Sequence, residues 1–179
     1  MPTRTEKLKQ VFNEWKIPIV AFATALILFK FVFLLVLIPT SSMYPTLPSP
    51  CYSISIRAAY WFNDPVRGDI VLFRRDNGDK TIFAKRIVGM PGDTIEIKHG
   101  VTYINGEVFE EDYLKETPDD ENYGPFQIPE GCYFMMGDNR NHSYDSRKWN
   151  EHFVPRKNIL SKIFYNISLE EFVSDQQQK

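Results

Sequence analysis

The chain has 179 residues, a formal net charge of −2 at pH 7 and an aromatic content of 15%. The near-neutral charge argues against a nucleic-acid-binding protein, which would carry a strongly basic face. Three scattered histidines and two cysteines show no metal-ligand spacing, so we expect neither a metal nor another cofactor. We expect Cys51 and Cys132 to be unpaired, although an exported domain could oxidise them to a disulfide. The sequence gives no indication of oligomeric state.

A long apolar run from Ile17 to Ile38 follows a short N-terminal segment, 1–16. The run contains one charged residue, Lys30, whose long stem could carry its amine toward the headgroups. At about 1.5 Å per residue, a helix of this length spans roughly 33 Å, which is enough for the hydrocarbon core of a bilayer. We therefore predict a transmembrane helix over 17–38. The alternatives are a cleaved signal peptide and a buried core helix.

The charges that flank this run are asymmetric. After the run, no Lys or Arg occurs until Arg57. The positive-inside rule therefore predicts a cytoplasmic N-terminus and an extracytoplasmic remainder. No Ala-x-Ala-like cleavage site follows the run, which favours a retained anchor. The basic residues that precede the run are Arg4, Lys7, Lys9 and Lys16.

The remainder, 39–167, is large enough for one domain and consists of short apolar or alternating runs separated by turns. Asn105-Gly106 lies between two such runs and predicts a type I′ hairpin. We predict a mostly-β domain, either a partly closed antiparallel β-barrel or a sandwich, on a single N-terminal transmembrane helix. The strands are predicted at 70–73, 81–88, 94–98, 132–136 and 159–167.

Two segments, one within the domain and one after it, are expected to lie outside the core. An acidic stretch near 110–125, interrupted by two prolines, is predicted to be a solvated surface loop. The polar tail 168–179 is predicted to be frayed.

Ser42, shortly after the apolar run, is a candidate nucleophile held at the membrane surface. A serine hydroxyl is a poor nucleophile until a base removes its proton, and the sequence offers no good Ser-His-Asp set. Lys85 lies in the apolar context Ile82–Val88 and could serve as that base. At an ordinary pKa of about 10.4 a lysine is almost fully protonated at pH 7, so burial would have to lower its pKa. The alternative is that Lys85 is a solvated strand lysine.

A second cluster of polar residues, 137–147, directly follows a predicted strand. It is either a turn held by Asx-type hydrogen bonds or a set of side chains that orient a base and brace a site. His142 is a candidate base, but without a paired nucleophile we expect an exposed loop histidine.

Four segments resemble, in order and after a membrane span, the conserved motifs of bacterial type I signal peptidases. Each motif is weak alone, whereas the ordered set is highly specific. The set covers nearly the whole chain outside the acidic stretch and the tail. The segments are Ser42-Met-Tyr-Pro-Thr-Leu47, Arg67-Gly-Asp-Ile-Val-Leu-Phe73, Lys85-Arg-Ile-Val-Gly-Met-Pro-Gly-Asp93 and Gly137-Asp-Asn-Arg140 through Asp145-Ser-Arg147.

This resemblance implies roles for particular residues. Ser42 matches the family nucleophile and Lys85 matches its general base. Ser143 matches a serine that orients the lysine, and Thr40 matches a hydroxyl that helps to form the oxyanion hole. One departure concerns Asn141-His142, where the family usually has Asp-Asn, so one carboxylate is lost. Supporting ion pairs are implied for Arg86, Asp138, Asp145 and Arg147.

The resemblance further implies a membrane-bound serine endopeptidase of the bacterial plasma (inner) membrane. It would remove N-terminal Ala-x-Ala-type signal peptides from exported preproteins by a Ser-Lys dyad mechanism, with the lipid bilayer as its other partner. Three alternatives stay open. They are a self-cleaving repressor, which would have a DNA-binding region and no span, a pilus- or conjugation-linked processing peptidase, and a non-catalytic membrane-anchored β-domain.

Overall fold

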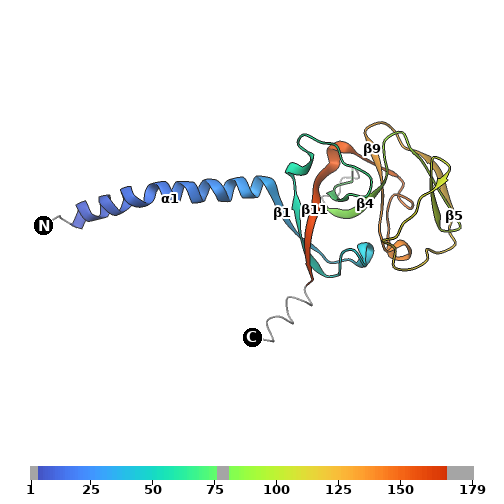
Figure 1. Cartoon of the computed structure of the whole chain (residues 1–179), viewed down its shortest axis with the longest axis horizontal. Coiled ribbons are helices and arrows are strands. Elements are labelled where there is room, and N and C mark those ends of the chain that lie inside the picture. The colour runs from blue at the N-terminus through green and yellow to red at the C-terminus, as the bar shows by residue number, and fades with distance from the viewer. Residues whose placement is uncertain (1–3, 76–80, 169–179) are drawn as a thin grey trace, which may run out of the picture.

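A computed structural model of the chain describes residues 4–75 and 81–168. Helix α1 (Arg4–Val32) extends away from a β domain formed by the other described residues (Figure 1). Within α1, Phe12–Val32 is long and apolar enough to cross a membrane, and its most apolar window is 0% buried. This lack of burial excludes the alternative of a buried core helix.

The helix ends earlier than the sequence predicts. Residues Phe33–Ile38, the last part of the predicted span 17–38, form strand β1. Strand β1 pairs antiparallel with β2 (Cys51–Ile56), from Phe33 opposite Ile56 to Ile38 opposite Cys51. A short apolar run suits a strand as well as a helix, and here pairing with β2 decides between them. Lys30 consequently lies in the last turn of α1, next to the β domain.

Two antiparallel sheets form the domain, and neither closes into a barrel. The larger sheet has seven strands in the order β1-β2-β11-β3-β4-β9-β10, and the smaller has four in the order β7-β6-β5-β8. The prediction of a mostly-β domain on one apolar helix is confirmed. The remaining strands are β3 (Ile70–Phe73), β4 (Phe83–Gly89), β5 (Thr94–Lys98), β6 (Val101–Ile104), β7 (Glu107–Val108), β8 (Tyr123–Gln127), β9 (Cys132–Met136), β10 (Phe153–Pro155) and β11 (Ile159–Ser168). Within residues 4–75 and 81–168, four 3-10 helices occur between strands: η1 (Ser41–Met43), η2 (Ala58–Tyr60), η3 (Arg140–His142) and η4 (Arg156–Asn158).

The predicted hairpin is present between β6 and β7. Asn105 and Gly106 have φ angles of 53° and 85°. A type I′ turn requires positive φ at both central positions, and asparagine and glycine tolerate this better than other residues.

The two sheets share an apolar core. Val88 of β4 and Phe134 of β9 are fully buried and pack with Ile95 of β5, so the larger sheet is joined to the smaller one at β4 and β9. This packing restrains the position of β4, a strand in the interior of the larger sheet.

Other predicted features have separate outcomes. Cys51 and Cys132 lie on β2 and β9, with β11, β3 and β4 between them, which is too far apart for a disulfide. Residues 123–125 of the predicted acidic loop belong to strand β8. The predicted frayed tail, apart from Ser168, lies outside the described residues.

Candidate active site

Ser42 and Lys85 lie side by side although they are far apart in the sequence. The tight turn η1 holds Ser42, and its geometry is fixed by hydrogen bonds from Tyr44 N to Ser41 O (3.0 Å) and from Leu47 N to Met43 O (2.9 Å). Lys85 Nζ lies 2.5 Å from Ser42 Oγ. This distance allows direct proton transfer between the two atoms.

The environment of Lys85 disfavours its charged form. Strand β4 lies between β3 and β9, and only 5% of the Lys85 residue is exposed. Burial lowers the pKa of Lys85 to about 8, while the charges of Asp145 and Asp138 oppose this effect and that of Arg147 adds to it. A substantial fraction of Lys85 is therefore neutral near pH 8, which a general base requires. The alternative of a solvated strand lysine does not fit this burial.

An apolar cavity of about 170 Å³ opens beside the two residues. Its walls come from the end of β1, from Leu72 of β3 and from the start of β4. Thr40, Ser42 and Lys85 line it as well, so the hydroxyl and the amine face a space with otherwise largely apolar walls.

The two hydroxyls assigned by resemblance have different surroundings. Thr40 is exposed, and its Oγ1 lies 3.5 Å from Ser42 Oγ, on the same side of η1 as the cavity. Ser143 is buried, and its hydroxyl helps to lower the pKa of Asp145, but within the described residues it makes no hydrogen bond to Lys85. The structure therefore gives no direct contact by which Ser143 would orient the lysine, and both roles stay predictions.

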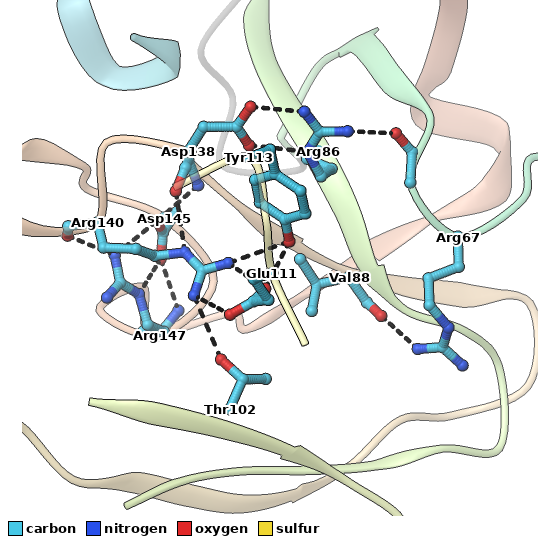
Figure 2. Close-up of polar contacts among 12 residues, drawn as sticks. Arg67, Arg86, Val88, Thr102, Glu111, Tyr113, Asp138, Arg140, Asp145 and Arg147 are labelled. Atoms are coloured by element: carbon cyan, nitrogen blue, oxygen red, sulfur yellow. Dashed lines mark hydrogen bonds and ion pairs between the residues drawn. The ribbon is translucent and has the colours of Figure 1, made fainter. Parts of the chain in front are cut away.

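Both ion pairs expected around the site are formed (Figure 2). Arg86 donates from Nε and Nη2 to Asp138 at 2.8 and 2.6 Å. Arg147 donates from Nε and Nη2 to Asp145 at 2.8 and 2.9 Å. Burial alone would raise the pKa of Asp145, but the Arg147 guanidinium and the Gly137 N–H lower it. Asp145 therefore stays ionised near Lys85.

Several contacts were missed from the sequence. Thr46 Oγ1 donates to Asp138 Oδ2 at 2.5 Å. Asn139 donates from its backbone N to Ser42 O and from Nδ2 to Ser41 O, each at 3.1 Å. Thr46 and Asn139 lie inside the matched motifs, and this position in a motif could have marked them as candidate site residues. Two further residues, Glu111 and Tyr113, come from the acidic stretch and contact Arg140, and no sequence pattern indicated them.

The departure at Asn141-His142 has a structural counterpart. Asn141 Oδ1 accepts from Asp119 N at 2.8 Å, and its Nδ2 donates to Thr117 O at 3.3 Å. A carboxylate could accept but could not donate, so the asparagine fits this position. His142 is exposed, as expected of a loop histidine.

Known proteins resemble this chain over most of its length. A family model described as signal peptidase, peptidase S26, matches residues 12–167. A probable signal peptidase I-2 of Synechocystis sp. is 42% identical over 132 residues, which cover 71% of this chain but only 59% of that relative. A signal peptidase I of Bacillus amyloliquefaciens is 37% identical over 159 residues, 82% of each protein. A crystal structure of a signal peptidase I from Enterococcus faecalis V583 has 32% sequence identity and a TM-score of 0.48, covering 57% of this chain and 98% of that one.

Proposed function

The chain belongs to the signal peptidase family, peptidase S26, and from this premise we propose that it removes N-terminal signal peptides from exported preproteins. The observation that carries the proposal is the distance of 2.5 Å between Lys85 Nζ and Ser42 Oγ, with the lysine buried. A serine next to a desolvated lysine is the minimum set for acyl transfer without histidine.

The proposed reaction begins when neutral Lys85 takes the proton of Ser42 Oγ as that oxygen attacks the scissile carbonyl carbon. The carbonyl oxygen becomes an oxyanion, which Thr40 Oγ1 and the Ser42 N–H would stabilise by about 3 kcal/mol per donor. Protonated Lys85 then gives its proton to the leaving amine, and the peptide bond breaks. Water, deprotonated by Lys85, hydrolyses the acyl-enzyme and frees Ser42.

The cavity beside Ser42 supports a preference for apolar side chains before the scissile bond. Its walls come from three strands and are largely apolar, so it suits an apolar side chain such as that of alanine. We therefore propose Ala-x-Ala-type signal peptides as the substrates.

The surface of the β domain supports a membrane-bound enzyme. Four apolar side chains are exposed on neighbouring strands β1, β2 and β11, where Leu37 pairs with Tyr52 and Ile54 pairs with both Leu35 and Tyr165. Such a patch next to α1 suits contact with the lipid interface, where tyrosine is favoured. We propose that α1 spans the bacterial plasma (inner) membrane with its N-terminus in the cytoplasm and the β domain outside. The exposed side chains are Leu35 (63%), Leu37 (48%), Tyr52 (41%) and Tyr165 (56%).

The proposed function predicts that the full chain, reconstituted in liposomes, cleaves an Ala-x-Ala preprotein once, after the second alanine. Replacing the alanine next to the scissile bond with aspartate is expected to abolish cleavage, because burying a carboxylate against largely apolar walls costs far more than burying a methyl group. The matched control is the Ser42→Ala protein, which keeps the fold and should leave the preprotein intact. Uncut preprotein in the presence of folded enzyme would overturn the proposed function and favour a non-catalytic binding domain.

The pH dependence of cleavage follows from the lowered pKa of Lys85. Because the neutral amine is the active form, kcat/KM should rise with pH and level off above about 8. An ordinary lysine would give a rise that continues beyond about pH 10. The control is His142→Gln, which should keep the same profile because the exposed histidine makes no hydrogen bond or ion pair with Ser42 or Lys85 within the described residues. A profile that is flat across this range would contradict lysine catalysis.

A further inference from the structure

Glu111, which the sequence places in a solvated acidic stretch, is buried in an ion pair with Arg140. The two side chains are only 6% and 2% exposed. Arg140 donates from Nη1 to Glu111 Oε2 at 2.6 Å and from Nη2 to Glu111 Oε1. Its other donors are also used, Nε by Gly137 O at 3.1 Å and Nη1 by Thr102 Oγ1 at 3.2 Å. Arg140 therefore links the acidic stretch and β6 to the loop that follows β9.

Tyr113 extends this link to the second arginine (Figure 2). Its hydroxyl donates to Glu111 Oε1 at 2.5 Å and accepts from Arg140 Nη2 at 3.3 Å. Its ring lies under the Arg86 guanidinium, 4.0 Å from the ring centroid, which is favourable cation–π geometry. Arg86 in turn binds Asp138. The segment 111–113 thus contacts Arg140, at one end of the 138–140 turn. It also contacts Arg86, the ion-pair partner of Asp138 at the other end.

This turn is the one that holds the nucleophile. Asn139 lies between Asp138 and Arg140, and its backbone N donates to Ser42 O at 3.1 Å. Gly137 packs so closely on the Ser42 carbonyl that an added Cβ would overlap it. A shift of Arg140 would therefore displace Gly137 and Asn139, which contact the Ser42 carbonyl oxygen.

Stability alone is a weak reason for such a cluster. A buried ion pair is often no more stabilising than apolar side chains of the same volume, because both charges lose their hydration. What the cluster does provide is a fixed geometry. The Arg140 guanidinium is held by the Glu111 carboxylate, and the Arg86 guanidinium by the Asp138 carboxylate and the Tyr113 ring.

We propose that Glu111 and Tyr113 are positioning residues for the Ser42–Lys85 site, acting through Arg140 and Arg86 on the turn that supports Ser42. The inference rests on the proposed function and deepens it. Glu111 fixes Arg140, and Tyr113 fixes both Glu111 and the Arg86 that binds Asp138. Neither residue touches the substrate.

Glu111 also balances charge around the base. The charged groups that act on Lys85 are Asp145, Asp138 and Arg147, and Arg140 interacts with Asp145. Without the Glu111 carboxylate, the positive charge of Arg140 is uncompensated beside Asp145. Protonation of Lys85 then becomes less favourable, so the pH at which activity levels off should fall.

The test compares Glu111→Gln with Glu110→Gln, a neighbouring exposed glutamate, in the full chain in liposomes. The Glu111→Gln change should lower kcat by about 10- to 100-fold with little change in KM, since an ångström of misplacement can cost two orders of magnitude. It should also move the rising limb of the pH profile to lower pH. Glu111→Asp should recover part of the kcat, and Glu110→Gln should match the wild type.

A second variant separates positioning from folding. Tyr113→Phe keeps the ring under Arg86 and loses only the hydroxyl, so it should fold and show a smaller fall in kcat. Wild-type kcat and pH profile in folded Glu111→Gln, even with a lower Tm, would overturn the positioning role. If Glu111→Gln does not fold, unchanged kcat in Tyr113→Phe would overturn it instead. A wild-type enzyme that cleaves no preprotein would overturn the proposed function along with this inference.

Discussion

Replacing Lys85 with methionine is expected to abolish preprotein cleavage while making the protein more stable. Methionine keeps the length and apolar stem of the side chain but cannot accept the Ser42 proton, whose transfer the 2.5 Å distance allows. Loss of the base in a serine hydrolase lowers kcat by about 10⁴-fold or more. Cleavage should therefore fall to the level of the Ser42→Ala protein, and the Ser42→Ala, Lys85→Met double variant should be no worse than either single variant.

The lowered pKa of Lys85 sets both the size of the stability gained by Lys85→Met and the pH range in which it is seen. Burial lowers the pKa of Lys85 from 10.5 to about 8. Between these values the unfolded chain binds more protons than the folded one, so the free energy of unfolding of the wild type rises with pH in this window. Below it, the buried amine is a cost of roughly 3 kcal/mol. Lys85→Met removes that cost and should raise the free energy of unfolding at pH 7 by up to that amount.

Denaturant unfolding of the two proteins at pH 7 and at pH 10 checks this prediction. The difference in stability should be large at pH 7 and small at pH 10. Lys98→Met is the control, because Lys98 is 53% exposed, and its contacts with Glu96 and the Tyr103 ring lie within the smaller sheet. It should change neither cleavage nor the pH dependence of stability. Retained cleavage in Lys85→Met would remove the lysine from the mechanism.

Replacing Gly137 with alanine is expected to cause the second-largest loss of activity. The added Cβ would overlap Ser143 Oγ and the Ser42 carbonyl oxygen. Ser143 Oγ can rotate away, but Ser143 Cβ, 2.6 Å from the added atom, and the Ser42 carbonyl oxygen can yield only if the backbone moves. Because an ångström of displacement at a reacting atom can cost two orders of magnitude, kcat should fall by about 100-fold. The overlap should also lower the free energy of unfolding by about 1–3 kcal/mol.

Gly89→Ala is the matched control for this variant. Its Cβ would meet only side chains, those of Ile128, Ile95 and Phe134, in the core between the sheets. It should reduce stability by a similar amount without changing kcat for the folded fraction. The Gly137→Ala, Ser143→Gly double variant should remain impaired relative to Ser143→Gly alone, since the contact with the Ser42 backbone persists. Full recovery in that double variant would show that Ser143, not the Ser42 turn, is the sensitive neighbour.

The sequence predicted the parts of the fold that depend on local pattern. Strands with alternating or compact apolar runs, and the turn at Asn105-Gly106, follow from side-chain period and from the φ angles that asparagine and glycine tolerate. The end of the helix did not follow, because Phe33–Ile38 is apolar in either conformation and only its pairing with β2 makes it a strand.

The candidate site was predictable to the extent that ordered motifs mark it. Ser42, Lys85 and the two ion pairs lie in those motifs, and the structure brings them together. Glu111 did not follow from the sequence, because an acidic residue among other acidic residues gives no sign that a buried arginine will pair with it. Thr46 lies inside a matched motif, but its bond to Asp138 did not follow from the sequence, because the two residues are 92 positions apart.

The most direct measurement is the pKa of the Lys85 amine in the folded chain, followed by NMR with ¹⁵N-labelled lysine and assigned by comparison with Lys85→Met. A buried amine beside Ser42 should titrate at about 8, in parallel with the rise in preprotein cleavage. Titration at the free lysine value of 10.5, with cleavage already complete at neutral pH, would mean that a charged, solvated lysine takes no part in the chemistry.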